Sequence, residues 1–170
     1  AIRDMTVDGS GYVYIIGSTA SVNNISTQNA FRTLNSGLND VYIAKYSPDG
    51  QRLWSTYYGG EGDDIGQSID VDPMGHVVVT GLTFSKNNIA SPGVHLTSYQ
   101  NEGDIFVAKF NDSGNFLWGT YYGGENFDFA NDITSDASGN IIITGWTNSL
   151  NGIATSGAHK AIKNDTTDIC

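Results

Sequence analysis

Acidic residues recur at a fixed spacing along this chain, and they are the first candidates for chemistry. Asp8, Asp72 and Asp136 are 64 residues apart, and each begins a turn of the form Asp-x-x-Gly. Their carboxylates, with oxygens of neighbours such as Ser138, could bind Ca²⁺, which takes about six to eight oxygen ligands. The same pattern also fits a structural role, in which each Asp caps its own turn. No cofactor other than this candidate Ca²⁺ is expected.

A second acidic group follows the tract Tyr-Tyr-Gly-Gly. It contains Glu61, Asp63 and Asp64, and Glu125 and Asp128 repeat part of it. Paired carboxylates can act as acid and base on glycosidic bonds when they are held roughly 5–10 Å apart. A catalytic pair is normally unique in a fold, whereas this group recurs, which favours a structural role between repeats; a repeated Ca²⁺ site is the intermediate alternative. The sequence also lacks zinc-protease, nucleophile-elbow and phosphate-loop motifs, so no enzymatic activity is expected.

Ligand binding is better assigned to side chains that the repeat does not require. Trp146 stands where the other units have Leu82 and Ser18, and Tyr99 lies in a long polar segment that begins with asparagines. Aromatic rings of this kind stack on sugars or on partner side chains. The predicted ligand-binding residues are Trp146, Tyr99, Asn87 and Asn88.

These residues are positioned by a tandem repeat. Shifting the chain by 64 positions aligns it with itself without insertions, and brings VYIAKY (41–46) onto IFVAKF (105–110) and the first TYYGGE (56–61) onto the second (120–125). Such a period indicates a repeat architecture. We predict two complete units, 1–64 and 65–128, and a truncated third unit, 129–170.

Within a unit, short runs rich in Val, Ile, Tyr and Phe alternate with Gly, Asn, Asp and Ser, which is typical of β-strands joined by turns. In the second unit the expected strands are 67–71, 76–82, 104–110 and 116–122. Four strands with two tight hairpins indicate a β-propeller blade. The polar segment 84–103 exceeds hairpin length, so we expect it to project from one face or to carry a short element of its own.

Composition excludes several partners. Eighteen acidic and eight basic residues give a formal net charge of -10, with a pI of about 4.3. This charge repels nucleic acid and anionic membranes, and no apolar run is long enough to insert into a bilayer. The single Cys170 cannot form an internal disulfide. Cysteine poverty with abundant Asn, Ser, Thr and Gly fits a secreted or cell-surface bacterial protein.

The repeated motifs resemble the bacterial seven-bladed β-propeller repeat family, SBBP. The matching residues in the second unit are Asp72, Gly75, Gly81, Thr83, Asp104, Ala108, Lys109, Leu117, Trp118, Tyr121, Tyr122, Gly123 and Gly124. The resemblance covers essentially the whole chain. It implies large, exported, surface-associated proteins and brings no catalytic residue set.

The sequence therefore predicts an all-β chain of about two and two-thirds propeller blades, whose loops bind a protein or carbohydrate in adhesion or scaffolding. The alternatives are part of a propeller enzyme acting on glycans, as a hydrolase or lyase, and a structural spacer in a large surface protein. Because a propeller normally closes with about 4–8 blades, the chain is expected to be part of a longer protein or to form a homo-oligomer that completes the ring.

Overall fold

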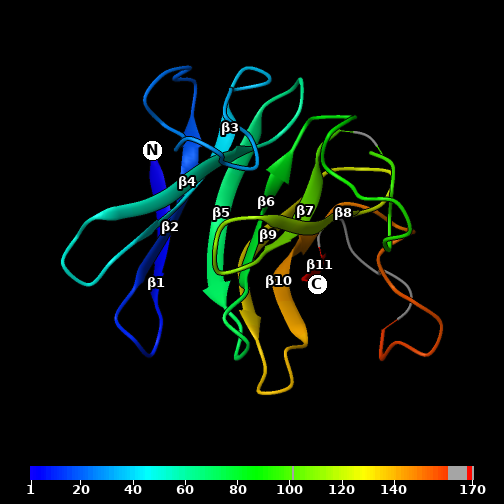
Figure 1. Cartoon of the computed structure of the whole chain (residues 1–170). Coiled ribbons are helices and arrows are strands. Elements are labelled where there is room, and N and C mark those ends of the chain that lie inside the picture. Colours follow the sequence, from blue (N-terminus) through cyan, green and yellow to red (C-terminus); the bar gives the residue numbers. More distant parts are fainter. Residues whose placement is uncertain (101, 161–167, 170) are drawn as a thin grey trace.

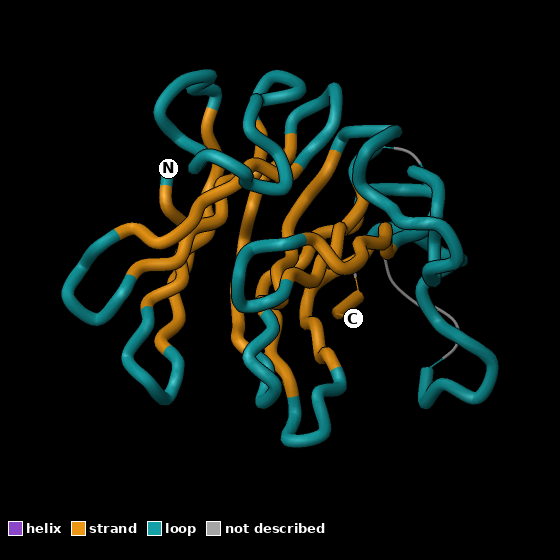
Figure 2. The backbone as a smooth tube through the Cα atoms, viewed as in Figure 1, coloured by secondary structure: helices purple, strands orange, loops and turns teal. Residues whose placement is uncertain are grey.

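The chain folds into antiparallel β-sheets joined by turns and long loops (Figures 1 and 2). The computed structural model describes residues 1–100, 102–160 and 168–169, and these contain strands but no helix. The strands are β1 (Ile2–Val7), β2 (Val13–Thr19), β3 (Asp40–Tyr46), β4 (Arg52–Tyr58), β5 (Asp64–Val71), β6 (Val77–Thr83), β7 (Asp104–Phe110), β8 (Phe116–Tyr122), β9 (Asp128–Ser135), β10 (Ile141–Thr147) and β11 (Asp168–Ile169).

Neighbouring strands in the sequence are also neighbours in the sheets. The first sheet has the order β1-β2-β3-β4, the second β5-β6-β7-β8, and the third β9-β10-β11. All pairs are antiparallel. The all-β class and the four antiparallel strands expected for the second unit are thus confirmed, and their arrangement is that of propeller blades. The predicted third unit is described to residue 160 and at 168–169.

A bulge recurs in the first strand of each sheet. Arg3, Gln67 and Asn131 are skipped in the pairing with the second strand, at positions 64 residues apart. The bulged strand brings a backbone oxygen close to the opposite residue. A Cβ on Gly81 would lie 2.0 Å from the carbonyl oxygen of Ile65, and Gly17 and Gly145 are equally constrained. The glycine that recurs at this position in every unit therefore has a steric cause.

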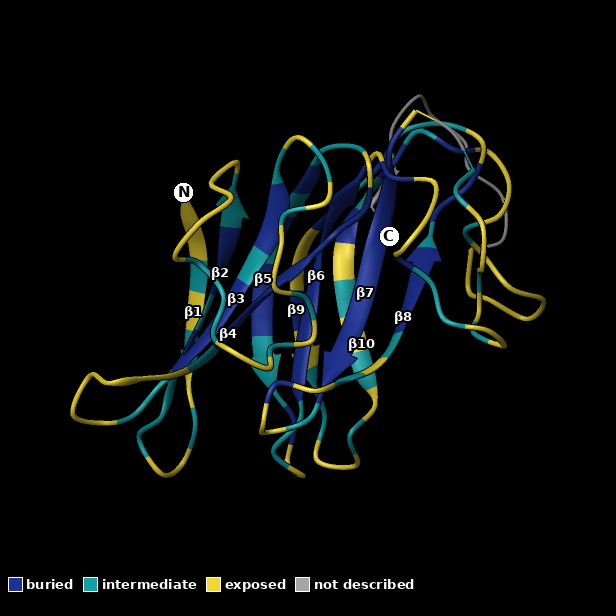
Figure 3. Cartoon of the chain, turned by 45° about the horizontal axis from the view of Figure 1, so that its top comes forward, coloured by how far each residue is buried: buried dark blue, intermediate teal, exposed yellow. Residues whose placement is uncertain are grey.

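The main core lies between the first and second sheets (Figure 3). Tyr14, Ile43 and Tyr58 of the first sheet pack against Phe106 and Phe110 of the second. A smaller core between the second and third sheets is formed by Val78, Ile105, Val107, Ala130 and Ile133. The second sheet is consequently covered on both faces, and every residue of β6 and β7 is buried.

The long loops after β2 and β6 run along the outer strand of their own sheet, β4 and β8 respectively, instead of only projecting from one face. In the first sheet the amide of Thr27 donates to Ser55 O at 2.9 Å, and the amide of Tyr57 donates to Arg32 O at 3.2 Å. Ser91 and Leu96 make the equivalent bonds to β8. The loops contain no strand or helix of their own in their described residues. They satisfy backbone groups at the edges of β4 and β8, which explains their route.

Candidate functional site

The three repeated aspartates predicted as Ca²⁺ ligands cap their own turns. One oxygen of Asp8 accepts the amides of Ser10 and Tyr12 at 2.8 and 3.0 Å. The equivalent oxygens of Asp72 and Asp136 accept amides two and four residues further along their own turns, at 2.8–2.9 Å. The glycine of each turn has positive φ, as the turn requires. The capping role that the sequence also allowed is therefore present in all three turns.

The second oxygen of each aspartate has a different partner in each unit. Asp72 Oδ2 accepts from Lys109 Nζ at 2.8 Å and contacts His76 Nδ1 at 3.0 Å. Burial raises the pKa of Asp72, but the bond from Lys109 and those from His76 outweigh it and hold the pKa at about 2. Asp8 accepts instead from the Tyr14 hydroxyl, and Asp136 from the Asn140 amide. Within the described residues, no three His, Cys, Asp or Glu side chains are grouped so as to hold a metal ion.

The acids that follow Tyr-Tyr-Gly-Gly are used in hydrogen bonds between adjacent units. Asp64 is fully buried and accepts from the hydroxyls of Thr83 and Ser85 and from the amide of Gly60. Asp128 repeats this network with Thr147, Ser149 and Gly124. The structural role favoured by their recurrence agrees with these contacts.

None of the four predicted ligand-binding residues lines the pocket described below. Asn87 is exposed, and its amide lies 3.3 Å from Glu61 Oε1. Asn88 has a φ of 66°, and its carbonyl accepts from Arg32 at 3.4 Å. Tyr99 packs edge-on against Tyr121, with ring centroids 6.2 Å apart. Trp146 stacks on Phe127 and Phe129, with centroids 5.4 and 5.9 Å away, and is half-buried. Asn87, Tyr99 and Trp146 thus make internal side-chain contacts, whereas the contact of Asn88 is made through its backbone.

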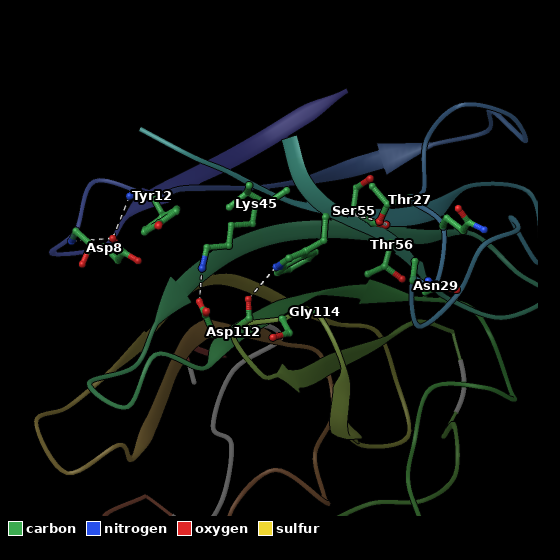
Figure 4. A pocket seen from close by; sticks show the side chains of 15 residues that line it. Asp8, Tyr12, Thr27, Asn29, Lys45, Ser55, Thr56, Asp112 and Gly114 are labelled. Atoms are coloured by element: carbon green, nitrogen blue, oxygen red, sulfur yellow. Dashed lines mark hydrogen bonds and ion pairs between the residues drawn. The ribbon is translucent and has the colours of Figure 1, made fainter. Parts of the chain in front are cut away.

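The structure instead brings residues of the first and second sheets together around a pocket of about 630 Å³ (Figure 4). Of the site residues predicted from the sequence, only Asp8 lines this pocket. The residues that line it are Asp8, Ser10, Tyr12, Thr27, Gln28, Asn29, Ala30, Lys45, Leu53, Trp54, Ser55, Thr56, Asp112, Ser113 and Gly114. They come from the β1–β2 turn, the loop after β2, strands β3 and β4, and the β7–β8 turn. The pocket therefore lies at the junction of the first two sheets.

An ion pair crosses this junction. The Lys45 ammonium of β3 contacts the Asp112 carboxylate of the β7–β8 turn, and the two side chains are 6% and 62% exposed. The ammonium also lies over the rings of Tyr12 and Tyr14, 4.4 and 5.1 Å from their centroids. The Tyr14 hydroxyl lies between two carboxylates, 3.0 Å from Asp112 and 3.1 Å from Asp8, and shares its one proton between them. Burial, together with these two carboxylates, raises the pKa of Tyr14, so the phenol stays protonated.

The indole of Trp54 forms part of the wall. Its Nε1 donates to the backbone carbonyl of Asp112 at 2.9 Å. A Cβ on Gly114 would lie 2.7 Å from the indole, so the backbone at this glycine packs directly on the ring. The neighbouring turn thus fixes the orientation of the indole.

The pocket combines repeated and unit-specific positions. Asp8, Lys45 and Trp54 occupy positions that the second unit repeats as Asp72, Lys109 and Trp118. Other lining positions change between the units: Gln28, Asn29, Ser113 and Asp112 correspond to Pro92, Gly93, Asp49 and Pro48. The repeated residues therefore form the walls of the pocket, whereas the four changed residues, which lie at its rim, are specific to this junction. Divergence between units at these positions was the one signal in the sequence that pointed to them.

Comparison with known proteins supports the repeat architecture. No family model matches the chain. The chain is 26% identical over 137 residues to the uncharacterized WD repeat-containing protein L264 of Acanthamoeba polyphaga mimivirus, a match that covers 78% of this chain and 10% of that protein. The chain thus spans about a tenth of the length of this relative. With the four-stranded antiparallel sheets, this likeness indicates a repeat protein of the β-propeller type.

The described residues include no helix of the length and apolar character needed to cross a membrane.

Proposed function

We propose that the chain is a non-catalytic β-propeller repeat module that binds a protein or carbohydrate. The observation that carries this proposal is the pocket at the junction of the first two sheets, whose rim residues differ from their counterparts in the second unit. Residues that recur in every unit are used in turns, bulges and contacts between sheets. A rim that departs from the repeat is where selection for a ligand can act without disturbing the scaffold.

The motifs of the repeat support a place in the bacterial SBBP family, and with it a secreted or cell-surface location and a role in adhesion or scaffolding. The two carboxylates of this pocket already have internal partners: Asp8 accepts amides of its own turn, and Asp112 is paired with Lys45. Binding without turnover is the function that these contacts favour.

A substitution that fills the pocket tests the proposal. Ser113 is exposed on the β7–β8 turn and its side chain makes no hydrogen bond within the described residues, so Ser113→Trp adds bulk at the rim without disturbing the core. The purified chain and the variant are applied to arrays of immobilised oligosaccharides and of extracellular proteins. We expect the variant to lose binding while its melting temperature is unchanged, and the bound ligand to be recovered intact.

Two results would argue against a binding module of this kind. Release of a cleaved product, abolished by substitution of one carboxylate, would favour a propeller enzyme acting on glycans. Binding that is the same in Ser113→Trp and wild type would place the ligand elsewhere, for example at Trp146 or Tyr99.

A further inference from the structure

The rim of the pocket carries polar side chains whose hydrogen-bonding capacity is unused. Ser10, Gln28, Asn29 and Ser113 all line the pocket, and all four are exposed. Among the described residues, no hydrogen bond uses a side-chain atom of any of them; Ser10 and Ser113 donate only through their backbone amides. Two hydroxyls and two amides are thus available, and each can both donate and accept.

The charged groups of the pocket are in the opposite situation. Lys45 is paired with Asp112 and lies against two aromatic rings. Asp8 accepts two backbone amides and the hydroxyl of Tyr14. Burial pushes the pKa of Asp8 upward, but these hydrogen bonds outweigh it, so the carboxylate is ionised at neutral pH. The cation Lys45 is already paired with Asp112, and an anionic ligand would also meet the ionised Asp8 and a chain of formal net charge -10.

The indole of Trp54, half-buried and held by the β7–β8 turn, lines the same pocket as these polar groups. An apolar ring together with neutral donors and acceptors matches one class of small ligand. The ring of a sugar presents aliphatic C–H groups on its faces and hydroxyls around its edge. The volume of the pocket lies within the range of about 300–1,000 Å³ found for small-molecule sites.

We propose that the pocket at the junction of the first two sheets binds a short, neutral oligosaccharide. The sugar ring packs on Trp54, and the amides of Gln28 and Asn29 with the hydroxyls of Ser10 and Ser113 bind its hydroxyl groups. This assignment rests on the proposed binding function and gives it a ligand class. It places specificity in the β1–β2 turn and the loop after β2, which belong to the first unit, and in the β7–β8 turn, which belongs to the second.

The test removes the rim amides without altering the backbone. Asn29 has a φ of 66°, so Asn29→Gly keeps a conformation that glycine tolerates while deleting the amide. It is combined with Gln28→Ala, which removes the second amide from an exposed side chain. The matched control is Asn88→Gly, because Asn88 has the same φ of 66° and does not line the pocket.

The purified 170-residue chain is titrated with neutral trisaccharides of glucose, mannose and N-acetylglucosamine, and binding is followed by saturation-transfer NMR and calorimetry. We expect at least one of them to bind and the double variant to weaken binding on the order of tenfold or more, since the hydrogen bonds of both rim amides are lost. Asn88→Gly should leave the affinity unchanged. Affinity should be the same in about 50 mM and about 500 mM salt, because no ion pair forms with a neutral ligand.

Three results would overturn the inference: no trisaccharide binds, only acidic saccharides bind and salt abolishes their binding, or the double variant binds as well as wild type. Failure of the inference is distinguishable from failure of the binding function. A protein ligand whose binding is lost in Ser113→Trp would refute the saccharide and leave the binding module in place. A saccharide lost in Asn88→Gly and kept in the double variant would move the site to the loop of the second unit.

Discussion

Asp40 is a residue whose environment gives the molecule a measurable pH response. Its side chain is fully buried at the start of β3, where Oδ2 accepts the amide of Ser36 at 2.7 Å. A Cβ on Gly59 would lie 2.8 Å from Asp40 Oδ1 and 2.6 Å from Asp64 Oδ2, so the two carboxyl groups share the space beside this glycine. Oδ1 has no hydrogen-bond partner among the described residues. Burial, followed by the charge of Asp64, raises the pKa of Asp40 to about 6, although Ser36 and Arg32 oppose the shift.

This raised pKa makes the free energy of unfolding depend on pH. Between the unfolded pKa of 3.8 and the folded pKa of about 6, the folded chain binds more protons than the unfolded chain. The contribution of Asp40 is therefore complete below pH 3.8, is lost as pH rises through about 6, and amounts to at most about 3 kcal/mol. The side-chain amide introduced by Asp40→Asn does not titrate, so this variant lacks the contribution.

Urea unfolding of wild type and Asp40→Asn at a series of pH values measures this contribution. We expect the difference in unfolding free energy between the two proteins to change between about pH 4 and about 6.5 in favour of the variant and then to level off. A difference that stays constant over this interval would show that Asp40 titrates normally.

At the scale of elements, the β7–β8 turn joins the second sheet to the first. Asp112 makes three contacts across the junction: its carboxylate with Lys45 and the hydroxyl of Tyr14, and its backbone carbonyl with the indole of Trp54. The equivalent residue of the first unit is Pro48, so the repeat itself does not demand an acid here. Because Lys45 is nearly buried, loss of the carboxylate would leave an ammonium without its anion.

Asp112→Ala is expected to lower the free energy of unfolding by roughly 1–2 kcal/mol. The ion pair is half in solvent, so its loss costs less than that of a fully buried pair. Asp49→Ala is the control, because Asp49 is exposed and bonds only within its own turn, to Ser47 and Gln51. Chemical denaturation of both variants gives the comparison; equal stability of the two would mean that the turn does not join the sheets through Asp112.

The elements also show which features a single sequence can reveal. The strands of the second unit were predictable because Asp-Pro-Met-Gly and Asn-Asp-Ser-Gly mark both hairpins, and the structure places the second pair of strands at the expected 104–110 and 116–122. The route of the long loops was not predictable, because Thr27 and Ser91 bond to the outer strands through backbone atoms, which any residue type supplies. The pocket was also missed, since Asn29 and Asp112 meet only when two sheets pack together.

At the scale of the whole molecule, the two outer sheets each present a face that no other described part of the chain covers. Ile69 in the second sheet is 3% exposed because the first sheet packs on it, whereas its equivalent in β1, Met5, is 57% exposed. At the other end Val78 is fully buried under the third sheet, and its equivalent Ile142 is 49% exposed. The same repeat positions thus form a core in the interior and an apolar surface at the ends.

At each interior junction, a face equivalent to that of Ile142 packs against a face equivalent to that of Met5. The two exposed end faces are therefore expected to fit each other in the same way. We therefore expect the isolated chain, with a monomer mass of 18.2 kDa, to self-associate in light scattering at about 100 μM, which is what the homo-oligomer alternative stated from the sequence requires. Met5→Glu with Ile142→Glu places carboxylates on both faces and should shift the mass to that of the monomer, because burying an unpaired carboxylate opposes association.

Val22→Glu is the control, since Val22 is 58% exposed in the loop after β2 and lies outside both faces. A monomeric wild type would show that the end faces do not associate with each other, and association that survives the double substitution but not Val22→Glu would place the contact on the loops.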